Sequence, residues 1–136
     1  MKSFTATVQQ GQTTEYVGTQ QFQADIFFRP PYVATVELDT KRVTEMHCMP
    51  KFVLIGMHVR PVRTYSELNG LVQVYNSAQN TNENALILGD FNADCSYFGP
   101  VDRQQNILYR EKGIFKWLVQ DGQKTNTGRR SCTYDR

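Results

Sequence analysis

The chain has 136 residues, of which 40% are hydrophobic and 21% are charged, so it has room for one domain built around one core. This composition excludes an intrinsically disordered protein. The net charge of +2 is too small to indicate nucleic-acid binding by itself, so any preference for DNA has to come from a local site. The longest apolar stretch, residues 52–57, is too short to span a membrane, and the N-terminal residues lack the apolar segment of a signal peptide.

Four segments have the β-branched and aromatic content of strands, namely residues 4–9, 32–38, 52–59 and 85–88. A helix is predicted between the third and the fourth. Thr64 and Glu67 have the spacing of a capping box, and the residues behind them form an apolar stripe at spacings of three and four: Tyr65, Leu68, Val72 and Tyr75. The polar residues 76–84 end this helix. Residues 52–88 therefore predict a strand–helix–strand unit with the helix packed on a sheet.

The strand at residues 85–88 is a continuous apolar run, which is typical of a strand covered on both faces. Further along, residues 104–110 predict a short helical turn. Residues 115–119 and 132–136 predict two weaker strands.

The three cysteines are Cys48, Cys95 and Cys132. None belongs to a C-x-x-C pair, so a zinc site has little support. An odd number allows at most one disulfide together with one free thiol. Spacing alone leaves three unpaired, buried cysteines as the simplest interpretation.

Polar residues follow the apolar strand at its carboxyl end, where open α/β sheets usually bind ligands. In an extended chain, Asp90 and Asn92 point to the same side. A carboxylate and an amide oxygen can hold a hard cation or orient a phosphate. A turn in which either residue caps its own backbone is the simpler interpretation of the spacing.

Two further residues could carry chemistry. His58 ends the preceding strand, and it lies at the same edge as Asp90 if the two strands are parallel, where imidazole could act as a general acid or base. The alternative is a structural histidine. Arg29 could bind a phosphate with its planar guanidinium, or its stem could cover the neighbouring aromatic residues. The basic residues near the C-terminus are most simply a solvated turn: Lys124, Arg129 and Arg130.

Residues 89–97 read Gly-Asp-Phe-Asn-Ala-Asp-Cys-Ser-Tyr, and this string resembles the signature of the deoxyribonuclease I family. It is much more specific than the bare G-D-x-N that the wider endonuclease/exonuclease/phosphatase superfamily shares. Other segments resemble the family in the same order: residues 29–31, 57–61 with the following helix, 115–118 and 131–136. The similarity runs from Ser3 to Arg136 and is weak between residues 39 and 50.

The resemblance implies catalytic roles for three residues. His58 is expected to act as a general acid or base toward the scissile phosphate, Asp90 to bind a metal ion, and Asp135 to orient a second catalytic histidine. Arg136 directly follows Asp135, so the chain holds no residue that matches this second histidine.

The remaining implied roles concern substrate and stability. Arg29, Asn92 and Tyr134 are expected to contact substrate phosphates, and Asn92 also the metal. Cys95 and Cys132 match the family's disulfide, which leaves Cys48 free.

The resemblance further implies double-stranded DNA as the substrate, Mg²⁺ with Mn²⁺ as a substitute, a secreted and extracellular protein, and no membrane association. Ca²⁺ and actin are additional ligands in the family. Lys124 and Pro30 stand where the family has acidic residues around its calcium loops, and Tyr32 replaces a small residue near its actin contact. These departures weaken the expectation of both ligands.

The expected fold is α/β of the α+β kind, a single partial domain over residues 1–136. It is a partial four-layer sandwich of two packed mixed sheets flanked by helices, with about half of the full domain present. An open sheet edge and bare apolar surface are therefore expected.

The expected function is that of a metal-dependent endonuclease, a hydrolase of DNA phosphodiester bonds, weakly active or inactive as this chain alone. The alternative is a non-catalytic DNA- or protein-binding module derived from such an enzyme; the context of Cys95 and Cys132 disfavours a sugar- or lipid-phosphate phosphatase.

Overall fold

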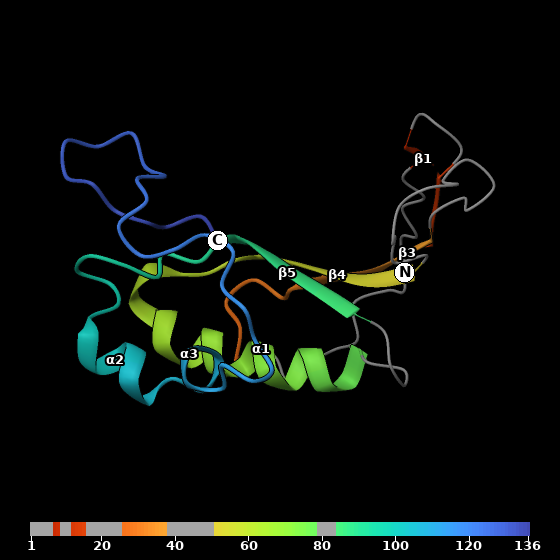
Figure 1. The fold of residues 1–136 in the computed structure, drawn as a ribbon, viewed down its shortest axis with the longest axis horizontal. Coiled ribbons are helices and arrows are strands. Elements are labelled where there is room, and N and C mark those ends of the chain that lie inside the picture. Colours follow the sequence, from red (N-terminus) through yellow and green to blue (C-terminus); the bar gives the residue numbers. More distant parts are fainter. Residues whose placement is uncertain (1–6, 9–11, 16–25, 38–50, 79–83) are drawn as a thin grey trace.

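The computed structural model describes residues 7–8, 12–15, 26–37, 51–78 and 84–136 (Figure 1). The described strands form one sheet in the order β1 (Thr7–Val8), β2 (Gln12–Glu15), β3 (Tyr32–Glu37), β4 (Lys51–His58) and β5 (Asn84–Asp90). Neighbouring strands are antiparallel, except that β4 and β5 are parallel. The helical elements are η2 (Pro61–Arg63), α1 (Thr64–Ala78), α2 (Pro100–Gln105) and α3 (Ile107–Arg110). None of the described helices has the length and apolar content that crossing a membrane requires.

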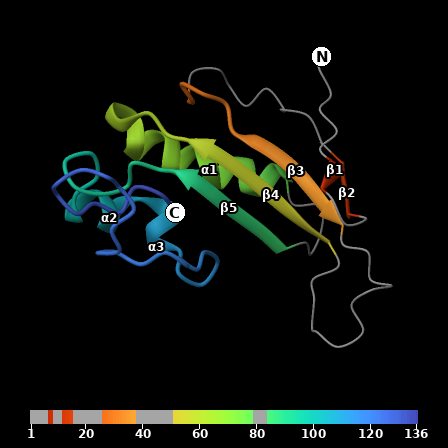
Figure 2. The same ribbon diagram turned by 90° about the horizontal axis from the view of Figure 1, so that it is seen from above.

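The predicted strand–helix–strand unit is confirmed as β4, α1 and β5. Figure 2 shows β3, β4 and β5 side by side with α1 along one face. The strand expected at residues 4–9 is present as β1 in its described part, and the rest lies outside the described residues. β2 was not predicted because its sequence, Gln-Thr-Thr-Glu, has no apolar residue to mark a buried face.

Two weaker strand predictions differ from the structure. Residues 115–119 form irregular chain, because Phe115 and Trp117 serve as aromatic contacts to the helices: their ring centroids lie 5.0 Å from Tyr75 and 4.0 Å from Tyr109, respectively. Residues 132–136 form a single antiparallel bridge to the end of β5 instead of a strand. The helical turn expected at residues 104–110 is confirmed as α2 and α3, which are separated at Asn106.

The capping box predicted for α1 is wrong. The Thr64 hydroxyl donates to the Pro61 carbonyl at 2.9 Å, and the Glu67 carboxylate is fully buried, where it accepts the backbone N–H groups of Phe28 at 3.0 Å and Arg60 at 3.1 Å. The physical reason is that η2 continues the helical path before Thr64, so Glu67 binds N–H groups of two other segments.

The core lies between α1 and one face of β4. Leu68, Leu71 and Val74 of the helix are fully buried, while the predicted stripe member Tyr65 is 38% exposed. The facing residues of β4 are also buried: Val53, Ile55 and Met57. Each such side chain contributes about 1.5–3 kcal/mol. The buried face of α1 is therefore centred on Leu68, Leu71 and Val74, and not on the predicted stripe that begins at Tyr65.

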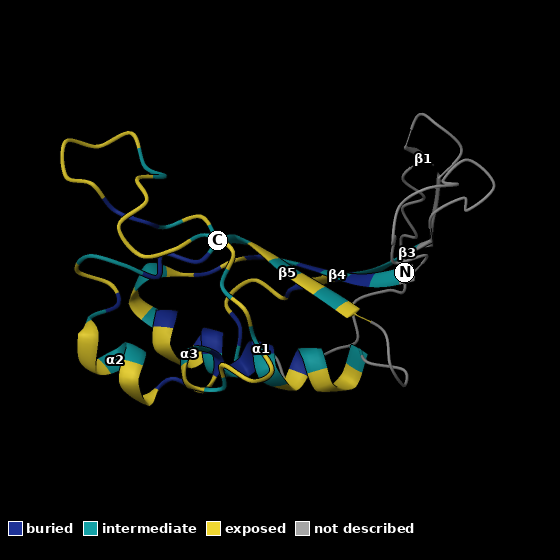
Figure 3. Ribbon diagram, in the orientation of Figure 1, coloured by how far each residue is buried: buried dark blue, intermediate teal, exposed yellow. Residues whose placement is uncertain are grey.

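The expectation that β5 is covered on both faces is wrong. Ala85 and Ile87 pack against the core, whereas Leu86 and Leu88 are 39% and 38% exposed. The described helices all lie on the same side of the sheet (Figure 1), so the other face of β5 has no helix over it (Figure 3). An apolar groove of about 620 Å³ runs beside β5. The expected bare apolar surface is thereby confirmed.

A disulfide joins Cys95 and Cys132, whose Cα atoms lie 5.8 Å apart. The interpretation of three unpaired cysteines is thus wrong, and the pairing implied by the family resemblance is confirmed. Cys48 lies outside the described residues.

Removing this disulfide is expected to lower the free energy of unfolding by about 4 kcal/mol in the chain-entropy model, because the bond closes a loop with a sequence separation of 37. Urea unfolding of the wild-type chain and of the Cys95→Ala/Cys132→Ala double variant measures the loss. A reductant should destabilise the wild type and leave the double variant unchanged. An equal response of both proteins to the reductant would contradict the prediction.

Candidate functional site

His58 and Asp90 are neighbours at the carboxyl ends of two parallel strands. The register of β4 and β5 pairs His58 with Asp90, and the Val59 N–H donates to the Asp90 carbonyl at 2.9 Å. The distance between His58 Nε2 and Asp90 Oδ2 is 3.7 Å, with the side chains 56% and 38% exposed. The predicted common edge is therefore confirmed, and both groups are accessible to a ligand.

The chain turns sharply after Asp90. The Asn92 N–H donates to Asp90 Oδ1 at 3.0 Å, and Asn92 has a left-handed backbone with φ of 49°. Its amide Nδ2 donates to the Val59 carbonyl at 2.9 Å, and the residue is only 6% exposed. The prediction of a turn in which Asp90 caps the backbone is thus confirmed. The expectation that Asp90 and Asn92 point to the same side of an extended chain is wrong, because the chain is not extended here. The role of Asn92 as a metal or phosphate contact stays a prediction.

A C-terminal segment completes this edge on the other side of β5. Asp135 forms an antiparallel bridge with Asp90, and the Phe91 N–H donates to the Tyr134 carbonyl at 2.9 Å. The Thr125 hydroxyl oxygen accepts the N–H groups of both Tyr134 and Asp135, at 2.8 and 3.0 Å. Because opposite residues of an antiparallel pair direct their side chains to the same face, the Asp90 and Asp135 carboxylates share one face.

The Tyr134 ring lies 5.7 Å from the exposed Tyr97 ring. Burial raises the pKa of the Tyr134 phenol above its ordinary value, the nearby Tyr97, Asp94 and Asp90 raise it further, and Arg130 acts in the opposite direction. A tyrosine phenol is protonated at neutral pH already at its ordinary pKa of about 10, so Tyr134 can donate a hydrogen bond to an anion.

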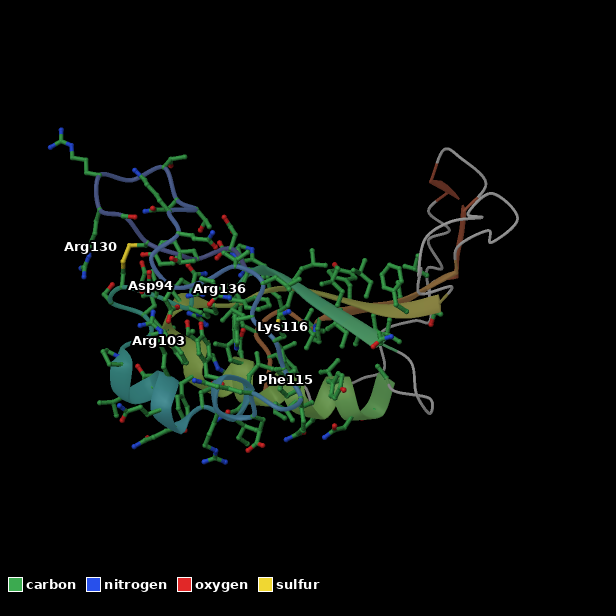
Figure 4. All side chains as sticks on the ribbon, in the orientation of Figure 1. Asp94, Arg103, Phe115, Lys116, Arg130 and Arg136 are labelled. Carbon is green, nitrogen blue, oxygen red and sulfur yellow. A yellow bond between two sulfur atoms is a disulfide. The ribbon has the colours of Figure 1, made fainter. Side chains whose placement is uncertain are left out.

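Asp94 fixes the disulfide-linked segment beneath this edge. Its carboxylate accepts Arg103 Nη2 at 2.6 Å and the Thr133 N–H at 2.8 Å. Figure 4 shows Asp94, Arg103 and Arg136 close to the disulfide. Burial alone would raise the pKa of Asp94, but the hydrogen bonds from Thr133, Cys95 and Arg103 outweigh it, so the pKa lies below its ordinary value.

The substitution Asp94→Asn is expected to lower the free energy of unfolding at pH 7 by about 2–3 kcal/mol, because it removes the negative charge beside Arg103 and replaces one of the two acceptor oxygens by an NH₂ group. A carboxylate with a depressed folded pKa stabilises the fold above its unfolded pKa, and this stability is lost as the pH falls through the folded value. The gap between wild type and variant should therefore close in acid. Urea midpoints from pH 7 to pH 2.5 measure it, and a gap that is constant with pH would contradict the assignment.

Arg29 lies on a different segment from His58 and Asp90. Its guanidinium carbon is 5.3 Å from the centroid of the Phe28 ring, and that of Arg60 is 4.3 Å from the same centroid. The interpretation of Arg29 as covering a neighbouring aromatic residue thus agrees with the structure, and its role toward phosphate stays a prediction. The basic turn at Lys124, Arg129 and Arg130 is exposed, as expected.

Within the described ranges, no group of three or more His, Cys, Asp or Glu side chains is arranged to hold a metal ion. Mg²⁺, however, usually binds through one or two carboxylates together with water and substrate phosphate oxygens. Asp90 fits that smaller requirement, since its carboxylate is accessible at the carboxyl end of β5.

Sequence reasoning missed the residues that hold the site together. Glu67 was assigned to a helix cap, and neither Arg60 nor Asp94 was singled out. A useful signal for Glu67 is its position directly beside Leu68 on the apolar side of a helix, where an acidic residue needs hydrogen-bond donors.

Comparison with known proteins gives consistent relatives. The chain is 38% identical over 115 residues to deoxyribonuclease-1-like 1 of Rattus norvegicus, a match that covers 82% of this chain and 35% of the relative. It is 32% identical over 121 residues to deoxyribonuclease-1 of Gallus gallus, covering 88% of this chain and 40% of the relative. It is 34% identical over 124 residues to deoxyribonuclease gamma of Homo sapiens, a match that covers 89% of this chain and 38% of the relative.

No family model matches the chain. The chain spans about two fifths of the length of the curated relatives that it matches. These relatives, the confirmed disulfide and the site at residues 89–97 point to the same origin. The chain is therefore a homologue of the deoxyribonuclease I family over most of its length.

Proposed function

We propose that this protein is a metal-dependent endonuclease that hydrolyses phosphodiester bonds of double-stranded DNA. The observation that carries the proposal is the 3.7 Å separation of His58 Nε2 and Asp90 Oδ2 at the accessible ends of two parallel strands. The relatives named above are deoxyribonucleases, which supports DNA as the substrate.

Hydrolysis of a phosphodiester needs a proton donor for the leaving oxygen and stabilisation of the charge on phosphorus. His58 is the proposed proton donor or acceptor at the scissile phosphate, with Asp90 beside it. Tyr134, whose ring lies 5.7 Å from that of Tyr97, is the proposed hydrogen-bond donor to the DNA backbone. Arg29 and Asn92 are proposed to contact neighbouring phosphates.

Mg²⁺ is the proposed cofactor, with Mn²⁺ as a substitute, and Asp90 and Asn92 are the residues proposed to hold it. Such an ion supplies positive charge that stabilises the developing negative charge on phosphate oxygens. Asp135 is proposed to orient a second catalytic histidine of the full site. Ca²⁺ and actin remain weaker predictions because of Lys124, Pro30 and Tyr32.

The proposed complete fold is a four-layer sandwich, of which the described sheet and helices form one part. The uncovered face of β5 supports this proposal, because exposed Leu86 and Leu88 would pack against a second sheet. Since the catalytic groups of such a site act as a unit, this chain alone is expected to hydrolyse DNA weakly or not at all.

An oxidising, extracellular location is also proposed. The Cys95–Cys132 disulfide supports it, because structural disulfides persist mainly in secreted proteins.

The alternative is a binding module without catalysis. Supercoiled-plasmid nicking by the purified chain with Mg²⁺ and Ca²⁺, with EDTA as the control, separates the two. Slow nicking that EDTA abolishes supports the nuclease. Binding of duplex DNA without nicking supports the module, and the absence of both from a folded chain would overturn the proposed function.

A further inference from the structure

We propose that Arg60 is a second phosphate-binding residue and that Arg60 and Arg29 together bind the DNA backbone beside His58, held in place by the buried carboxylate of Glu67. This inference rests on the proposed function, because it takes DNA as the ligand. We refer to the two side chains as the Arg29–Arg60 pair.

The Arg29–Arg60 pair is assembled on one aromatic ring. The guanidinium carbons lie 5.3 Å and 4.3 Å from the centroid of Phe28, which is itself 51% exposed. The two positive groups are therefore within about 10 Å of each other, and both arginines are exposed. Stacking on a ring orients a guanidinium through its face and leaves the N–H groups at its edge available for an anion.

No carboxylate of the described residues forms an ion pair with either member of the Arg29–Arg60 pair. The ion pairs among the described residues use different arginines, such as Arg110, whose Nε lies 3.5 Å from Glu111 Oε1. Two adjacent cations without a carboxylate partner in this part of the chain repel each other, and an anion between them removes that cost. Phosphate oxygens match the planar donor geometry of guanidinium groups.

Glu67 is the positioning residue. It is fully buried, and its two oxygens each accept one backbone N–H, Oε1 from Phe28 and Oε2 from Arg60. These N–H groups belong to segments that are far apart in sequence, and the carboxylate joins them at 3.0 and 3.1 Å. The backbone that carries Arg29 is thus fixed against the backbone that carries Arg60.

The location of Arg60 suits a DNA strand that passes over His58. Arg60 follows His58 by two residues, so their Cα atoms are at most about 7 Å apart. A phosphate at His58 therefore has its neighbour on the same strand within reach of Arg60. Contacts of this kind hold the backbone and do not distinguish bases.

The test is the salt dependence of duplex binding, measured by fluorescence anisotropy with a labelled DNA duplex in EDTA, where cleavage is absent. Each phosphate contact contributes about 0.9 to the slope of log K against log salt. Arg60→Ala is expected to reduce the slope by about 1, so the ratio of wild-type to variant affinity falls about three- to fourfold between 50 and 200 mM salt. Arg110→Ala on α3 removes the same charge and is expected to leave the slope unchanged.

Two further variants separate positioning from charge. Arg60→Lys retains the charge and is expected to keep the slope while weakening affinity, because the planar donor is lost. Glu67→Gln raises the net charge from +2 to about +3, so a long-range field alone would strengthen DNA binding. The proposed positioning role predicts weaker binding, because an amide NH₂ cannot accept a backbone N–H.

The outcomes are distinguishable. A wild-type chain that binds duplex DNA with the same slope as Arg60→Ala overturns this inference and leaves the proposed function in place. A folded wild-type chain that does not bind DNA overturns both. If Glu67→Gln binds more tightly than wild type, the positioning role is wrong. If it fails to fold by circular dichroism, the two Arg60 variants decide the inference.

Discussion

Substitution of His58 by alanine is expected to remove whatever slow plasmid nicking this chain shows, because a general acid or base usually contributes a factor of about 10²–10⁴ to the rate. The imidazole is the proposed proton-transfer group, and its Nε2 lies 3.7 Å from Asp90 Oδ2. No other described histidine is present to replace it, since His47 lies outside the described residues. Initial rates of conversion of supercoiled to nicked plasmid, with a long time course for the variant, measure the effect.

The exposure of His58 makes this experiment a test of chemistry instead of folding. Its side chain is 56% exposed, so His58→Ala is expected to change the free energy of unfolding by less than about 0.5 kcal/mol. Gln104→Ala, at an exposed position of α2, is the matched control for handling and purity. A nuclease activity that survives in His58→Ala and disappears with EDTA would place the chemistry elsewhere or in a contaminant.

The parts of the fold that the sequence predicts well are those with a strong local pattern. β3 and β4 carry β-branched and aromatic runs, and α1 has an apolar stripe, so both their type and their approximate bounds could be predicted. The common edge of His58 and Asp90 followed from one further assumption, namely that a helical crossover joins parallel strands.

The parts that the sequence did not predict depend on contacts between distant segments. A run of four apolar residues in β5 does not reveal which face is covered, because exposure depends on what packs there. The role of Glu67 depends on the N–H group of Phe28, 39 residues away. Local spacing favoured a helix cap, and the long-range hydrogen bond replaced it.

Family resemblance supplied what the physics of spacing left open. Three cysteines allow several pairings, and the Cys95–Cys132 bond was chosen by the resemblance alone. The roles of Tyr134 and Asp135 have the same origin, whereas those of Arg29 and Asn92 were also indicated by the chemistry of their side chains. All four roles stay predictions.

Gly89 directly precedes Asp90, and its replacement by alanine is expected to destabilise the fold by about 3–5 kcal/mol. A Cβ atom at this position would lie 1.8 Å from the Met57 carbonyl oxygen, which is a backbone atom of β4 that cannot move without distorting the sheet. The backbone φ of +145° is also strained for any residue other than glycine. The combined cost of this clash and this strain is a large fraction of the free energy of unfolding that a domain of this size has.

The effect should extend to the site, because Gly89 exchanges two backbone hydrogen bonds with Arg136 and pairs with Met57 next to His58. Urea unfolding followed by circular dichroism measures the loss. Gly113→Ala is the matched control, since a Cβ there meets no atom within 4 Å, and it should change stability by no more than about 1 kcal/mol. If Gly89→Ala unfolds at the same urea concentration as Gly113→Ala, β4 and β5 cannot approach as closely as described. The placement of Asp90 opposite His58 would then lose its physical basis, and with it the observation on which the proposed nuclease activity rests.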